Sequence, residues 1–205
     1  MTGAPRDTIT LAGSTATVTE FFACALSSIL YQRGVYPPEL FEPKKQYGLT
    51  VMAVKDPKLQ AYINTVLAQF SDWLGTGTLQ KAVLVISSAR TGESLERWAF
   101  EIRTDASAIS ARVAREKPAG AISAEIQAII RQITASITFL PLLSEPCTID
   151  LLAYTARDSA VPTEWEESDP RHVKRGEAVQ LRSFDTTAHR VQALVSYKVD
   201  DVIDG

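Results

Sequence analysis

The chain has 205 residues and a mass of 22.4 kDa, with 45% hydrophobic and 22% charged residues. This composition predicts one globular domain that buries roughly 70% of the surface of its unfolded chain. A net charge of -3 argues against a nucleic-acid binder that relies on overall positive charge. The sequence has no apolar run of 18 residues and no secretory signal, so we expect an intracellular protein without a membrane interaction. The two cysteines, Cys24 and Cys147, are expected to be buried thiols.

The first fifty residues predict a helix followed by a strand. Apolar side chains recur at helical spacing over residues 18–30, with Ser14 as the expected N-cap and Gly34 as the stop. Two consecutive prolines then predict an extended connection. Residues 47–54 are expected to form the first strand.

A second helix and a hairpin follow. Asp56 is the expected N-cap and Pro57 the first helical residue, and the apolar face continues to Gly75. The apolar run at 79–86 and the segment at 95–102 predict an antiparallel hairpin. Its first strand is expected to be buried on both faces because its apolar residues are continuous.

The remaining core elements are a helix and a strand. Residues 104–118 predict a polar connection, and isoleucines from Ile122 to Ile137, with Leu140, predict a third helix that ends before Pro141. A last core strand is expected at 148–154, beside the hairpin. Three helices and a mainly antiparallel sheet define an α+β fold in which this strand has a free edge that an extended segment can join.

The segment from Tyr154 to Gly205 has strand-like alternation but few apolar side chains. Residues 163–170 predict a polar loop, whereas the alternation at Val179–Leu181 and at Val191–Val199 predicts a strand pair. Because terminal segments usually fray, ordered strands here imply docking on the edge of an earlier sheet. A chain poor in reactive groups, with such a tail, is better explained as a binding module than as an enzyme.

The most tempting set of residues for hydrolytic chemistry includes one of the two histidines. His189 with Asp185 and Ser183 has the composition of a catalytic triad. No glycine-framed nucleophile and no strand-turn-helix context accompanies it, so hydrogen-bonding residues on a strand are the favoured interpretation. We therefore predict no catalytic residue.

An acidic group surrounds one tryptophan in the tail. Glu164, Glu166 and Glu167 flank Trp165 and suggest either a paired-carboxylate site or a hard-cation site. A solvated acidic loop anchored by the tryptophan is the favoured alternative. No Walker loop, dinucleotide fingerprint or zinc spacing is present, so no cofactor and no metal is predicted.

Several strings resemble the HORMA family, in particular its spindle-assembly-checkpoint branch, the mitotic arrest-deficient-two family. They are SILYQRGVYP at 28–37, LERWAF at 95–100, RQITASITFLPLL at 131–143, VPTEWEES at 161–168 and LRSF at 181–184. The resemblance covers essentially the whole chain. It implies a single HORMA domain over 1–205, with a core at 1–153 and a mobile C-terminal "safety belt" at 154–205.

The resemblance implies a non-enzymatic switch with two topologies. In the open state the belt packs on the sheet edge, and in the closed state it moves to the opposite side and traps a partner's linear peptide as an added strand. The implied peptide-binding edge is Asp150, Leu151, Leu152, Ala153 and Tyr154, and the implied belt residues are Val161, Trp165, Leu181, Phe184, Val195 and Tyr197.

The resemblance also implies partners and a location. The peptides belong to the kinetochore scaffold mitotic arrest-deficient one and to the co-activator of the anaphase-promoting complex, whose inhibition delays anaphase. Further partners are a checkpoint pseudokinase/kinase complex, an AAA+ remodeller with a HORMA-like adaptor, and a second copy of the chain. The implied dimerisation residues are Arg131, Gln132, Phe139 and Arg182. The nucleus, kinetochore and cytoplasm are the expected locations. The alternatives are a HORMA adaptor of a translesion polymerase or of the meiotic chromosome axis, and a remote one is a hydrolase that uses His189.

Overall fold

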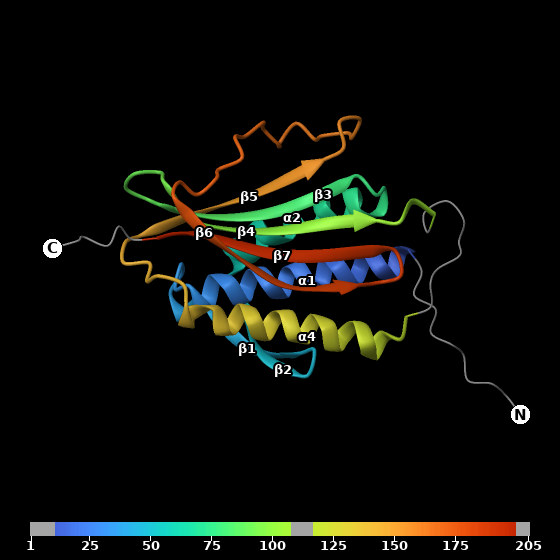
Figure 1. Ribbon diagram of the computed structural model, residues 1–205, viewed down its shortest axis with the longest axis horizontal. Coiled ribbons are helices and arrows are strands. Elements are labelled where there is room, and N and C mark those ends of the chain that lie inside the picture. The colour runs from blue at the N-terminus through green and yellow to red at the C-terminus, as the bar shows by residue number, and fades with distance from the viewer. Residues whose placement is uncertain (1–10, 108–116, 200–205) are drawn as a thin grey trace, which may run out of the picture.

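A five-stranded antiparallel sheet with helices against one face organises the computed structural model, which describes residues 11–107 and 117–199 (Figure 1). The strand order is β5-β3-β4-β7-β6, and every neighbouring pair is antiparallel. These strands are β3 (Leu79–Ser88), β4 (Ser94–Thr104), β5 (Cys147–Thr155), β6 (Gly176–Asp185) and β7 (His189–Lys198). The α+β class predicted from the sequence is confirmed, and the two tail strands join the sheet as expected.

Three α-helices lie within the described residues. They are α1 (Leu11–Gln32), α2 (Pro57–Gly75) and α4 (Ala119–Ala135), and α1 packs between the other two (Figure 1). The Asp56 cap of α2 is confirmed, since its carboxylate accepts a hydrogen bond from the backbone N–H of Leu59 at 2.8 Å. The Ser14 cap of α1 is wrong. The helix already begins at Leu11, and the buried Ser14 hydroxyl bonds residues of the tail instead.

A separate two-stranded sheet precedes α2. It contains β1 (Phe41–Gln46) and β2 (Leu49–Val54), after the short helix η1 (Pro38–Leu40). The sequence predicted the second of these strands but took the first as a connection, because β1 is exposed, charged and interrupted by Pro43. Tyr47 and Gly48 both have positive φ, which fits a two-residue hairpin turn, and Gln127 of α4 donates to the Tyr47 carbonyl at 2.8 Å.

The end of α4 differs from the expected long helix. After Ala135 the chain forms the short helix η2 (Ser136–Thr138), so Leu140 is buried but Ile137 is 49% exposed. The helical register therefore breaks before Ile137. Most of the predicted polar connection at 104–118 lies outside the described residues.

The main core lies between the helices and the sheet, and the tail contributes to it. Phe184 of β6 is fully buried with its ring 4.8 Å from that of Phe21, which also contacts Phe22 and Phe100. On the other, helix-free face, β3 and β4 bury Val83, Val85 and Ala99 in a small second cluster. Burial of β3 on both faces is thus confirmed.

Two further findings on the described residues concern membrane-spanning helices and the state of the two cysteines. No helix in the described part of the chain is both long and apolar enough to span a membrane. Cys24 is buried and Cys147 is partly buried, and both are free thiols. Burial raises the pKa of the Cys24 thiol to about 11, so it stays protonated at neutral pH.

One ion pair is buried in the core. Arg33, just after α1, bonds the Glu96 carboxylate of β4 through two nitrogens at 2.8 and 2.5 Å, and these side chains are 4% and 2% exposed. Glu96 also accepts from the Trp98 indole at 3.1 Å, and Arg33 donates to the Pro141 carbonyl. Each charge is therefore paired and hydrogen-bonded, as a buried charge must be.

We predict that Glu96→Gln lowers the free energy of unfolding by about 3–5 kcal/mol, because it leaves the Arg33 charge buried without a counter-ion. Urea unfolding measures this loss. The control is Glu101→Gln on the same strand, which removes the exposed Lys81 pair and should cost less than about 1 kcal/mol. Equal effects of the two substitutions would contradict the prediction.

Candidate peptide-binding groove

The outer edge of β5 pairs with no strand among the described residues. Its inner edge pairs with β3, from Cys147 opposite Ser88 to Thr155 opposite Leu79. Leu151 and Ala153 pack against the main core, whereas Leu152 and Tyr154 pack against the cluster on the helix-free face. Strand β5 thus combines alternating side chains with an outer edge that pairs with no described strand.

A groove of about 460 Å³ lies along this edge. The segment 156–175 between β5 and β6, which we call the crossing segment, forms its other wall. The lining residues are Trp73, Leu151, Leu152, Ala153, Tyr154, Thr155, Val161, Trp165, Glu166, Glu167, Ser168 and Asp169. Four of the five predicted edge residues therefore line the groove, together with two of the predicted belt residues. The fifth, Asp150, binds the crossing segment through Arg171.

Trp165 fixes the crossing segment against α2. Its ring centroid lies 5.0 Å from that of Trp73 and 6.0 Å from that of Phe70. The Trp73 indole also donates to the Ala160 carbonyl at 3.0 Å. The interpretation of an acidic loop anchored by a tryptophan is confirmed, since the neighbouring glutamates are exposed. Nowhere in residues 11–107 or 117–199 do three or more His, Cys, Asp or Glu side chains gather in a way that could hold a metal ion.

The β6–β7 hairpin lies at the opposite edge of the sheet from the groove. β7 pairs with β4, and β6 is the outermost strand (Figure 1). This is the arrangement that the resemblance assigns to the closed state. The other four predicted belt residues, Leu181, Phe184, Val195 and Tyr197, are buried in the main core, so they hold the hairpin rather than line the groove.

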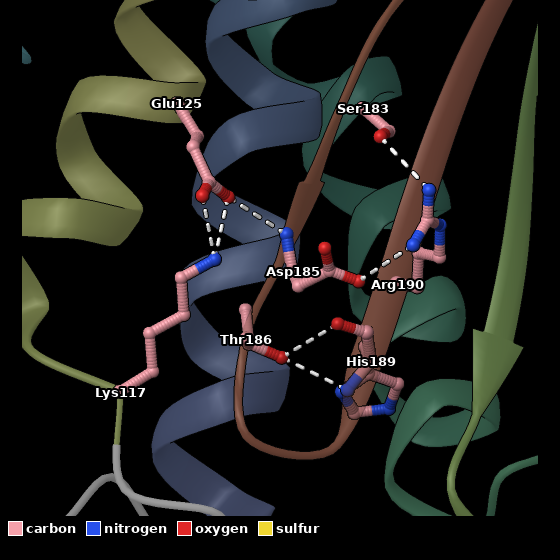
Figure 2. A network of polar contacts seen from close by, with 7 residues as sticks. All are labelled: Lys117, Glu125, Ser183, Asp185, Thr186, His189 and Arg190. Carbon is pink, nitrogen blue, oxygen red and sulfur yellow. Dashed lines mark hydrogen bonds and ion pairs between the residues drawn. The ribbon is translucent and has the colours of Figure 1, made fainter.

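The turn of this hairpin is held by His189 (Figure 2). Its Nδ1 lies 2.6 Å from the Ser14 hydroxyl of α1, and its Nε2 lies 3.2 Å from the Leu74 carbonyl of α2. Thr186 Oγ1 accepts from the His189 backbone N–H and donates to its carbonyl. Burial lowers the pKa of His189, although the contact with the Leu74 carbonyl raises it in part.

The triad hypothesis is wrong. In Figure 2 Ser183 and Asp185 both approach Arg190, which lies 3.3 Å from the serine hydroxyl and 3.6 Å from the carboxylate. Neither residue bonds His189, whose ring contacts Ser14 and the Leu74 carbonyl instead. The three residues therefore form no proton relay.

Side chains of α4 bond the backbone at the outer edge of β6. Glu125 Oε2 accepts from the Asp185 N–H at 3.0 Å, and Gln132 Oε1 accepts from the Arg182 N–H at 2.7 Å. Partial burial raises the pKa of Glu125, but hydrogen bonds from Lys117 and from the Asp185 N–H outweigh it and hold the pKa below its usual value. The helix thus occupies the place of a further strand.

Three of the four predicted dimerisation residues lie on α4 and β6, and the fourth, Phe139, follows the short helix η2. Gln132 bonds the Arg182 backbone, and Arg131 is exposed beside it on α4. Phe139 is 41% exposed, with its ring 6.3 Å from that of Tyr197. Sequence reasoning missed the contact that Gln132 makes with the hairpin, because it links positions 50 residues apart.

Sequence reasoning also missed three residues around the groove. Trp73 has the helical spacing of a core residue, and nothing local marks it as a groove residue. Arg97 and Arg171 each stand among other charged residues of their segments, and the hydrogen bonds that tie them to other elements span 57 to 84 residues. A buried position on β4 for Arg97 was the only available signal.

The fold and groove place the chain in a known class. The sequence profile of the HORMA domain matches residues 14–189, and the chain belongs to the HORMA domain family. The mitotic spindle assembly checkpoint protein MAD2A of Dictyostelium discoideum is 50% identical over 198 residues, 97% of each chain. The human protein of that name is 50% identical over 191 residues, 93% of each chain.

Solved structures agree with this family. A chain of the mitotic checkpoint complex superposes with a TM-score of 0.85 at 42% identity, covering 91% of this chain and 99% of that one. Caenorhabditis elegans HTP-2, in a structure bound to the HIM-3 closure motif, has a TM-score of 0.76 at 14% identity over 97% of this chain and 98% of that one. At that identity the second likeness concerns the fold alone.

We predict that the protein loses stability as the pH falls below about 6.5, the ordinary histidine pKa. Because the pKa of His189 is lower in the folded protein, the unfolded chain takes up the proton first. Stability is therefore full above that pH and decreases below it. Urea unfolding at about pH 7.5 and 5.5 measures this, in a range above the carboxylate pKa values. His189→Gln should reduce the pH dependence, and the exposed His172→Gln should leave it unchanged. The reverse pattern would refute the assignment to His189.

Proposed function

We propose that the chain is a spindle assembly checkpoint adaptor that traps a linear peptide along β5 and thereby delays anaphase. The observation that carries the proposal is the open β5 edge, which faces a groove walled by the crossing segment. Identity near 50% to checkpoint proteins over at least 93% of the chain supports the biological role. The family acts by protein binding and not by catalysis.

The chemistry of the edge supports capture of an extended peptide. Main-chain hydrogen bonds to β5 contribute about 0.5–1.5 kcal/mol net each, and alternate side chains of the peptide enter the groove. Because the crossing segment covers the peptide, the peptide leaves only after local opening of that segment. Affinity is therefore governed by a slow dissociation rate.

The division into a core at 1–153 and a safety belt at 154–205 is part of the proposal. In the open state the hairpin leaves β4 and packs at the groove edge of the sheet, where it competes with the peptide. Two such packings of one sequence coexist only when their free energies differ by a few kcal/mol. The family resemblance supports this switch, and so does the strand pairing, in which the hairpin joins the rest of the sheet through β7 alone.

The proposed ligands are aliphatic peptides of the kinetochore scaffold mitotic arrest-deficient one and of the anaphase-promoting-complex co-activator. The checkpoint pseudokinase/kinase complex and an AAA+ remodeller with a HORMA-like adaptor complete the partners, in the nucleus, kinetochore and cytoplasm. The polymerase alternative is weaker. The Schizosaccharomyces pombe DNA polymerase zeta processivity subunit is 28% identical over 155 residues, far below the checkpoint relatives.

The peptide proposal is tested with a dye-labelled aliphatic peptide from the kinetochore scaffold. Trp165→Ala removes the anchor of the crossing segment and should weaken binding at least ~10-fold, as loss of a central aromatic contact does. Leu142→Ala, 91% exposed and outside the groove, is the matched control and should not change binding. Fluorescence anisotropy measures both. Equal affinities for wild type and Trp165→Ala would count against capture under the belt.

We also propose that a second copy of the chain docks on α4, the end of η2 and β6 through Arg131, Gln132, Phe139 and Arg182. The exposed Arg131 and Phe139 support this surface. Arg131→Glu should abolish self-association in sedimentation velocity without changing peptide affinity. Unchanged dimerisation of this variant would exclude the surface.

A further inference from the structure

The crossing segment is fixed at two points on opposite faces of the sheet. Trp165 packs on α2, on the helix-covered face. Pro170 and Arg171 bind residues of β3, β4 and β5 that share the helix-free face with Val83, Val85 and Ala99. Residues 166–169 connect the two points around the β5 edge and line the groove. The two attachments therefore close a ring around whatever occupies the groove.

Arg97 of β4 forms the inner part of the second attachment. It is 5% exposed, and its Nε donates to the Pro170 carbonyl at 3.0 Å. Its terminal nitrogen donates to the Tyr154 hydroxyl at 3.1 Å, and the guanidinium lies 5.9 Å from the Tyr154 ring centroid. Detachment of Pro170 removes an acceptor from a buried charged donor, which is costly. The Arg97 side chain thus links the crossing segment to the peptide-binding strand.

Arg171 forms the outer part. Its guanidinium donates to the Ser87 hydroxyl of β3 at 2.9 Å and pairs with the Asp150 carboxylate of β5 at 3.2 Å. Its backbone has a φ of 50°, uncommon for a residue with a side chain, and the Asp169 carboxylate accepts from its N–H at 2.7 Å. This local turn points the side chain back across the sheet edge.

We propose that Arg171 and Arg97 are positioning residues that latch the crossing segment over a captured peptide and set the rate at which the peptide leaves. The inference rests on the proposed function and names what controls release from that same groove. A strand held between β5 and residues 166–169 leaves sideways only after one attachment opens. The Arg171 attachment is the weaker one, because its pair with Asp150 is partly exposed whereas Trp165 packs on two aromatic rings.

The test measures peptide release from the full chain. The dye-labelled scaffold peptide is bound, and excess unlabelled peptide is added while anisotropy is followed. Arg171→Asn removes the guanidinium, and asparagine tolerates the positive φ. We expect release to accelerate about 10-fold, as loss of charge-assisted hydrogen bonds does, with little change in association rate. Lys174→Asn, which removes an exposed charge from the same segment, should release peptide at the wild-type rate.

The salt dependence of the peptide release rate separates loss of the ion pair from a general loss of packing. Raising ionic strength should speed release from the wild type, because the Arg171–Asp150 pair is screened, and should have a smaller effect in Arg171→Asn. The second variant, Arg97→Lys, keeps the charge but loses the forked geometry and should also speed release. Urea unfolding without peptide confirms that each variant is folded.

The outcomes separate the two proposals. If the wild type binds and releases slowly but Arg171→Asn releases at the same rate, the latch is refuted and peptide capture stands. If the wild type does not bind the peptide, the proposed function fails and the latch fails with it. Faster release from Lys174→Asn as well would assign the effect to net charge and would also refute the latch.

Discussion

Strand β5 presents backbone hydrogen-bonding groups along an edge that no other described strand takes up, and the rest of the structure depends on this edge staying open. Exposed strand edges usually promote aggregation, and proteins protect them with charges, bulges or covering segments. Here the crossing segment covers the edge but does not pair with it, because a groove separates the two. The result is a protected edge that still has room for one strand.

The edge is open because the tail hairpin is held elsewhere. β7 pairs with β4 from His189 to Tyr197, Phe184 enters the aromatic core, and α4 bonds the outer edge of β6 through Glu125 and Gln132. These contacts cover the β6 edge of the sheet with α4 and leave the β5 edge to a ligand. Gln132 bonds the hairpin and also lies on the proposed dimer surface. Docking of a second copy at that surface would therefore act directly on a contact that holds the hairpin.

The local elements could be predicted from the sequence. The Asp56 cap, the strand at 148–154 and the strand pair of the tail all depend on neighbouring residues, and the structure confirms them. Ser14 was misassigned as a cap because its hydroxyl bonds Thr186 and His189, more than 170 residues away. Strand β1 was missed because its exposed charges have no apolar pattern.

The site was predicted only in part, because alternation in the tail does not say which edge of the sheet the tail joins. The resemblance supplied Trp165 and residues 150–154, while Trp73, Arg97 and Arg171 emerged only from the fold. Their roles come from contacts across both faces of the sheet. No spacing in the sequence encodes such contacts.

Amide hydrogen exchange with and without the scaffold peptide tests the central claim most directly. If a peptide adds to β5 beneath the belt, amides in 147–155 and in the crossing segment become protected together. Protection confined to other strands, or no change along β5 at saturating peptide, would contradict the account.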